Sequence, residues 1–165
     1  MEEINDLSFE TILTRNHDRI WRLCRAYTTS MEDAQDLFQE IALNIWRGLK
    51  TYKGQAVIST WVYRIALNSS INYSIRLRRD GKNLLSLHIV DFAASSENKE
   101  DERIEQLYRF VNRLNNADRS LITLYFEDFS HKEIAEITGI SENYVAVKLS
   151  RIREKLSNYF KTITP

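Results

Sequence analysis

The sequence contains few residues that break helices or cross-link a chain. Its 165 residues include one proline, four glycines and one cysteine, Cys24. Scarce proline and glycine exclude a collagen-like or a Pro/Gly-rich disordered chain, and a single cysteine excludes an intramolecular disulfide. The sequence has no signal peptide and no apolar run long enough to span a bilayer. We therefore expect a soluble, cytoplasmic protein without membrane insertion, in which Cys24 is a core thiol.

The chain also lacks an excess of charge, because 23 cationic side chains balance 23 acidic ones. The two signs are nevertheless segregated. Residues 64–79 contain four arginines and no acid, and residues 143–161 contain five cations and one acid. Acids gather at residues 32–40 and 97–105. This pattern suggests two basic contact surfaces and an acidic surface for a basic partner, although any single run is more typical of a solvated face.

Apolar residues recur at intervals of three and four along most of the chain, and hydrophobic residues make up 43% of it. That period predicts an all-α protein with enough apolar surface for real cores. The pattern dissolves over residues 81–103, which predicts a flexible linker. We therefore predict two small helical domains, at residues 5–80 and 104–163.

Hydroxyl side chains mark where the first helices should begin. Ser8 precedes the first apolar repeat, and Ser30 followed by Asp33 resembles a capping box. A third helix is expected to start at Trp61, with Ser59 or Thr60 as its cap.

The most informative stretch is FSHKEIAEITGISENYVAVKLSRIREKL, residues 129–156. Ser130 and Glu133 form a capping box, Gly139 supplies a left-handed residue, and Ser141 caps a second helix. This arrangement predicts a helix-turn-helix whose second helix enters the DNA major groove. Its polar and cationic face suits base edges and phosphates. The alternative is an ordinary corner between two helices of a bundle.

Two other helix faces carry polar patterns. An acidic stripe at helical spacing is either solvated surface or a docking site for a basic protein; it consists of Asp33, Asp36, Glu40, Asn44 and Arg47. Cations and amides near aromatic rings, as in single-strand binders, occur at Arg64, Asn68, Asn72, Arg76 and Arg79. Trp61 beside them is explained at least as well as a core anchor.

Three segments in this order resemble the extracytoplasmic-function (ECF) sigma factors. They are DAQDLFQEIALNIWRGL (33–49), STWVYRIALN (59–68) and the helix-turn-helix ending in LSRIREKL. The resemblance covers nearly the whole chain. It implies a region 2-like domain at 5–80 and a region 4-like domain at 104–163. It also implies a transcription initiation factor that binds core RNA polymerase, directs it to promoters and assists strand opening, without covalent chemistry or a cofactor.

The resemblance also implies roles for individual residues. The motif that the family docks on the clamp helices of the polymerase β′ subunit is matched by Asp33, Asp36, Gln39 and Glu40. Recognition of the −10 element, including capture of a flipped base, is implied for Lys53, Gly54, Trp61, Arg64, Asn68, Arg76, Arg78 and Arg79. Contacts to −35 DNA are implied for Lys132, Asn143, Lys148, Ser150 and Arg151. The β subunit and an anti-sigma factor are further implied partners.

The chain departs from the family pattern at three positions. Tyr144 stands where the family often has threonine, Ala146 where it often has a basic residue, and Asn72 where aspartate is common. The sequence preference of the family's promoters therefore cannot be transferred to this chain.

Two alternative functions remain for comparison. A conventional helix-turn-helix regulator with an N-terminal sensing or dimerisation domain would bind duplex promoter DNA by itself. A small helical enzyme lacks support, because no CxxC, HExxH, phosphate-binding glycine loop or nucleophile elbow occurs. No metal site is expected either, since the histidines are scattered at His17, His88 and His131.

Overall fold

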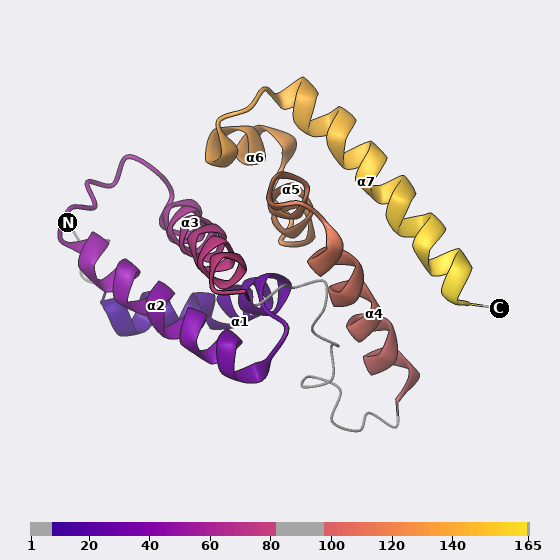
Figure 1. Cartoon of the computed structure of the whole chain (residues 1–165). Coiled ribbons are helices and arrows are strands. Elements are labelled where there is room, and N and C mark those ends of the chain that lie inside the picture. Colours follow the sequence, from indigo (N-terminus) through magenta and orange to yellow (C-terminus); the bar gives the residue numbers. More distant parts are fainter. Residues whose placement is uncertain (1–7, 82–97, 165) are drawn as a thin grey trace. The chain divides into compact units, whose positions relative to one another are not determined.

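The computed structural model describes residues 8–81 and 98–164. These residues form seven helices and no strands, which confirms the all-α prediction. The chain divides into two compact units, residues 1–83 with α1 to α3 and residues 84–165 with α4 to α7 (Figure 1). Most of the predicted linker lies outside the described residues.

The first unit is a bundle in which each helix contacts the other two. The helices are α1 (Phe9–Tyr27), α2 (Met31–Leu49) and α3 (Ile58–Arg79). Their core contains the fully buried side chains Ile20, Leu23, Leu37, Ile41 and Ile45. Cys24 is buried as predicted, and burial raises the pKa of its thiol to about 12. The thiol therefore stays protonated and unreactive at neutral pH.

The first two helices of this unit start where their hydroxyl caps predict. Ser8 and Ser30 are the N-caps of α1 and α2, and Ser30 accepts from the backbone N–H of Asp33. The prediction for α3 was wrong, because its N-cap is Val57, which has no side-chain hydrogen bond. Thr60 is buried in the first turn instead. Packing of that turn against the bundle, rather than a capping hydroxyl, sets where α3 begins.

The second unit contains α4 (Lys99–Arg113), α5 (Asn116–Phe126), α6 (His131–Thr138) and α7 (Glu142–Ile163). Helix α4 starts well before the expected boundary at Ile104, so the end of the predicted linker is helical. Helix α5 is central and contacts each of the other three. Its buried Arg119 donates to the carbonyls of Asn112 and Leu114 at the end of α4, at 2.9 and 2.8 Å. These bonds satisfy carbonyls that the helix end leaves open.

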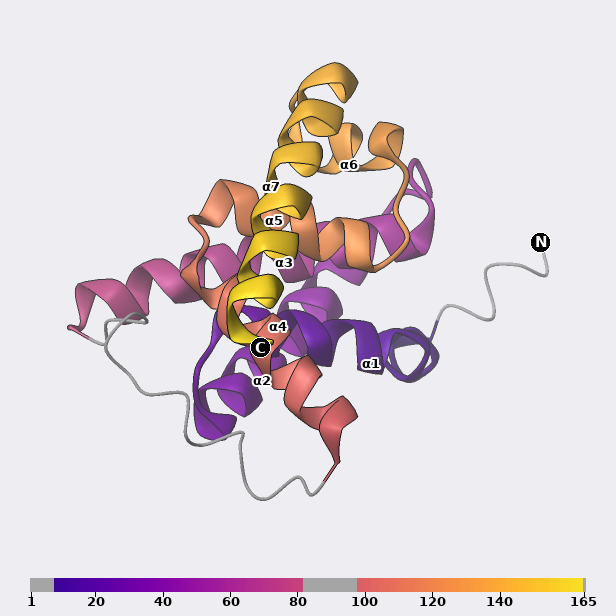
Figure 2. The same cartoon turned by 90° about the vertical axis from the view of Figure 1, so that its right-hand side faces the viewer.

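Helices α6 and α7 form the predicted helix-turn-helix (Figures 1 and 2). Ser130 and Glu133 make the full capping box, in which the backbone nitrogens of Ser130 and Glu133 lie 2.7 and 3.2 Å from the side-chain oxygens that accept from them. Gly139 ends α6 at a φ of 76°, and Ser141 caps α7 by accepting from the N–H of Tyr144. All of these local signals are confirmed. Among residues 8–81 and 98–164, no helix is long and apolar enough to cross a membrane.

Candidate functional site

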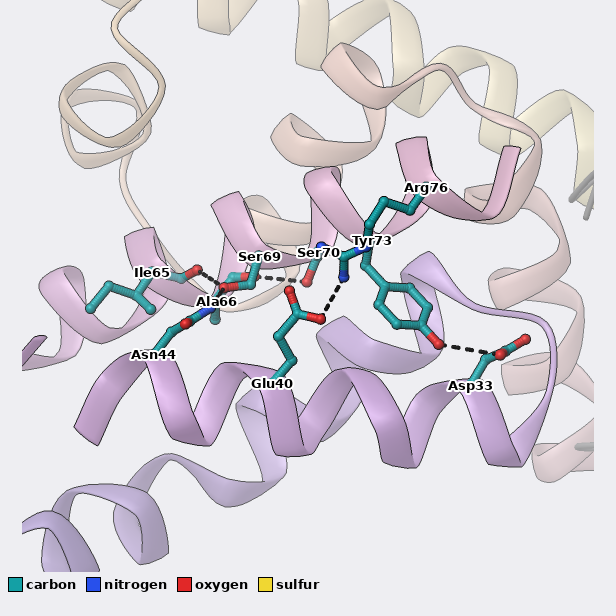
Figure 3. Close-up of polar contacts among 9 residues, drawn as sticks. All are labelled: Asp33, Glu40, Asn44, Ile65, Ala66, Ser69, Ser70, Tyr73 and Arg76. Carbon is teal, nitrogen blue, oxygen red and sulfur yellow. Dashed lines mark hydrogen bonds and ion pairs between the residues drawn. The ribbon is translucent and has the colours of Figure 1, made fainter. Parts of the chain in front are cut away.

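Polar side chains join α2 to α3 along one line, which we call the α2–α3 seam (Figure 3). The Tyr73 hydroxyl donates to Asp33 Oδ1 at 3.2 Å. Arg76 Nη2 donates to Glu40 Oε2 at 2.5 Å. Nearer the end of α2, Asn44 Nδ2 donates to Ser69 Oγ at 2.9 Å. Three residues of the acidic stripe thus face α3 rather than bulk solvent.

The seam holds its charged groups in a partly desolvated setting. Asp33 is only 8% exposed. Burial, and then the neighbouring carboxylate of Asp33, raises the pKa of Tyr73 well above its usual range, so the hydroxyl remains a donor. The guanidinium of Arg76 also lies 5.4 Å from the centre of the Tyr73 ring. The seam therefore helps to hold α2 in one orientation against α3.

A different face of α2 points to solvent, and we call it the α2 outer face. It consists of Asp36, Gln39, Leu43 and Trp46, which follow one another at intervals of three and four. Leu43 and Trp46 are each about half exposed. Large apolar side chains beside acidic ones are typical of a protein-binding surface. Sequence reasoning missed Leu43 and Trp46, although both fall outside the buried stripe of Leu37, Ile41 and Ile45.

The loop before α3 is held by aromatic packing. Tyr52 lies 4.9 Å from Trp61 between ring centres, and its hydroxyl donates to the carbonyl of Ala56. Trp61 in turn lies against α2 at Gly48, where a Cβ atom would be 2.9 Å from the ring. Trp61 is thus the anchor of the loop. The residues at the loop's exposed tip are Lys53 and Gly54, the latter at a φ of 70°.

The outer side of α3 carries the remaining predicted −10 residues. Asn68, Arg78 and Arg79 are exposed, whereas Arg64 and Arg76 are partly buried. The side chain of Arg76 is 43% exposed although it pairs with Glu40. Arg76 therefore keeps part of its side chain open to solvent while it is bonded to Glu40.

The outward face of α7 carries the predicted residues Asn143, Ser150 and Arg151, all exposed. Tyr144 and Val147 lie among them and are each half exposed. Sequence reasoning did not assign these two, although neither belongs to the buried stripe of α7. Lys132 on α6 is exposed as well.

Lys148 differs from these residues, because it turns toward α5. Its Nζ lies 3.0 Å from Asp118 Oδ1. The hydrogen bond and the charge of Asp118 raise the pKa of Lys148. The stabilisation linked to this raised pKa of Lys148 is present at neutral pH and is lost as the pH rises through the raised value.

Metal binding and an apolar groove are the remaining features of the described residues. Within the described part of the chain, no three His, Cys, Asp or Glu residues are grouped so as to hold a metal ion. An apolar groove of about 540 Å³ runs between α4 and α7 in the second unit; its lining includes Ile104, Leu107, Phe126, Leu156 and Phe160.

Comparison with known proteins identifies both units. The family profile of sigma-70 region 2 matches residues 12–81, and that of sigma-70 region 4 matches residues 104–156. The RNA polymerase sigma factor SigV of Bacillus subtilis is 29% identical over 144 residues, which cover 86% of this chain and 84% of SigV. The ECF RNA polymerase sigma-E factor of Escherichia coli K12 is 26% identical over 164 residues, which cover 92% of this chain and 85% of that protein. The chain belongs to the ECF sigma factors.

Two solved structures share the fold of this sigma factor. CnrH, solved in complex with the cytosolic domain of CnrY, superposes with a TM-score of 0.69 at 17% identity, covering 93% of this chain and 88% of CnrH. The sigma factor RpoE from Bartonella quintana, solved in complex with the anti-sigma factor NepR, superposes with a TM-score of 0.70 at 17% identity. The match covers 93% of this chain and 96% of RpoE.

Family membership decides between the functions that the sequence left open. This sigma factor directs RNA polymerase to promoters, as a transcription initiation factor. A conventional helix-turn-helix regulator is not favoured, because α1 to α3 match sigma region 2 instead of a sensing or dimerisation domain. Region 2 thus contains the α2–α3 seam, the α2 outer face and the anchored loop, while region 4 contains the helix-turn-helix.

Proposed function

We propose that the α2 outer face of this sigma factor docks on core RNA polymerase. The observation that carries the proposal is the combination of exposed acidic and amide groups with two half-exposed apolar side chains, Leu43 and Trp46, on one helix face. A basic partner helix with apolar side chains would match this surface. Asp33 and Glu40 support docking indirectly, because the α2–α3 seam holds the helix in place.

The loop and α3 read the −10 element in this proposal. Lys53 and Gly54 lie at an exposed tip whose shape Tyr52 and Trp61 hold. A preformed loop lowers the ordering cost of capturing a flipped base. The cations of α3 then contact the phosphates of the opened strand.

Helix α7 reads the −35 element in the major groove. It belongs to a domain at 99–163, which a linker connects to the domain at 5–80. Lys132 lies near phosphate, and the exposed side chains of α7 face the bases. The groove between α4 and α7 suits an apolar segment of the polymerase β subunit. An anti-sigma factor would cover these same surfaces. The protein acts in the cytoplasm, without a cofactor and without enzymatic activity of its own.

The experiment that tests this function compares the protein alone with the reconstituted holoenzyme. Purified protein should shift promoter DNA only when core polymerase is added, and the holoenzyme should start RNA chains that core polymerase alone does not start. Tight binding of duplex promoter by the protein alone would instead favour the conventional regulator.

Val147 is expected to read thymine, because a half-exposed valine on the recognition helix offers an apolar contact for the 5-methyl group. Deoxyuridine substituted for one thymine of the −35 element should weaken holoenzyme binding about fourfold, the value of one buried methyl group. V147A should bind both DNAs equally. I163A, which truncates another exposed side chain of α7, should keep the methyl preference. Equal methyl dependence in V147A and the parent protein would refute this role.

A further inference from the structure

Lys148 is a cation of the recognition helix that does not face outward. Its side chain is 27% exposed, and the Asp118 carboxylate that it meets on α5 is 6% exposed. The residues on either side behave as the helix period requires, with Val147 outward and Leu149 in the core. Lys148 lies at the boundary between these two faces, so its ammonium group reaches α5 instead of the groove-facing side.

Asp118 is built into the first turn of α5. Its backbone N–H donates to Asn115 Oδ1 at 2.8 Å, and its Oδ2 lies 3.5 Å from Asn115 Nδ2. A buried carboxylate is costly unless it is paired and hydrogen-bonded. Lys148 supplies the pairing charge from a helix 30 residues further along the chain. The requirement of Asp118 for a partner therefore constrains where α7 lies.

Two kinds of contact hold α7 in the second unit: a buried apolar stripe and the Lys148–Asp118 ion pair. Val145, Leu149 and Ile152 bury an apolar stripe against the rest of the second unit. Apolar burial is non-directional and tolerates small rotations of a helix. A hydrogen-bonded ion pair has a narrow range of distance and angle. The Lys148–Asp118 pair thus selects one rotation and one axial position among those that the apolar stripe permits.

We propose that Lys148 is a positioning residue for −35 recognition, which holds α7 at one setting on α5 and makes no contact with DNA phosphate. The proposal rests on the assignment of α7 to −35 DNA above, and it withdraws Lys148 from the set of direct DNA contacts. The side chains that touch bases are then the outward ones: Asn143, Tyr144, Val147, Ser150 and Arg151. The position of these side chains along the DNA major groove depends on the Lys148–Asp118 pair, which lies on the side of α7 that faces α5.

The test measures holoenzyme binding to a promoter with its cognate −35 element and to one with that element scrambled, at several salt concentrations. D118N removes the charge of the partner without touching α7, and K148Q removes the cation. Each variant should lower the ratio of cognate to scrambled promoter affinity about three- to tenfold. The slope of log affinity against log salt should stay unchanged. A loss of stability alone would reduce the active fraction equally on both promoters, so the ratio separates positioning from folding.

K132Q is the matched control, because Lys132 is an exposed lysine of the same helix-turn-helix. If Lys132 contacts phosphate, K132Q lowers the salt slope by roughly one. K148R, which keeps the charge, should retain the ratio and serves as the conservative variant if K148Q fails to fold. A reduced salt slope in K148Q, or an unchanged ratio in D118N, would overturn the proposal. Loss of −35 dependence is expected for R151A in either case, so an unaffected R151A would refute the assignment of α7 itself.

Discussion

Reversal of one charge on the α2 outer face, D36R, is expected to weaken binding to core RNA polymerase by about tenfold or more. Asp36 is exposed on α2, so the substitution leaves the core of the first unit intact. A like charge placed against a basic partner both lowers the association rate and costs free energy in the complex. Equilibrium binding of the labelled protein to purified core polymerase measures the effect.

The control for D36R is D18R, which makes the same charge change on α1. The side chain of Asp18 is 88% exposed, and its Oδ1 lies 3.1 Å from Nδ1 of the adjacent His17. D18R should bind core polymerase as the parent protein does, and the far-ultraviolet circular dichroism of both variants should match the parent. Unchanged polymerase affinity in D36R would mean that the outer face is solvated surface and that docking lies elsewhere.

The four residues of the predicted docking motif illustrate what a sequence can and cannot assign. The spacing of Asp33, Asp36, Gln39 and Glu40 placed all four outside the apolar stripe of α2 that contains Leu37, Ile41 and Ile45. It could not tell that Asp33 and Glu40 bond to α3 while the other two face solvent. The period of a helix defines faces, but the neighbour that each face meets is a property of the tertiary packing.

Local signals were the most reliable. The capping box at Ser130, the left-handed Gly139 and the cap at Ser141 involve residues within a few positions of one another. Such bonds form wherever the segment folds, so sequence alone predicts them. The start of α3 was missed because it depends on packing of the first turn, where no polar cap operates.

Longer-range features had no signature that one sequence could show. Gly48 looks like an ordinary helical glycine until the ring of Trp61 is placed against it. Lys148 counted as one of several cations on a basic helix, and only the position of Asp118 on α5 separates it from Arg151. Charge and spacing therefore predicted the helix-turn-helix, whereas the direction of each side chain came from the fold.

Removal of two cations from α3, in the double variant R76A/R79A, is expected to lower open-complex formation by at least about tenfold at moderate salt. Each phosphate contact contributes roughly 0.7 to 0.9 to the slope of log affinity against log salt. Arg79 is exposed, so R79A alone should reduce the slope by about that amount. Arg76 is partly neutralised by Glu40 at 2.5 Å, so R76A alone should reduce the slope less.

The difference in salt slope between R76A and R79A separates a contact with DNA from a loss of packing. If Arg76 acts only within the α2–α3 seam, R76A lowers stability and leaves the salt slope unchanged. If Arg76 also contacts phosphate, E40Q should increase the contribution of Arg76 to the salt slope, because the guanidinium then loses its competing anion. Open-complex formation measured over a salt series, with K161A as an exposed lysine at the far end of α7 for control, decides between them. An unaltered slope in R76A/R79A would remove both arginines from the −10 interface.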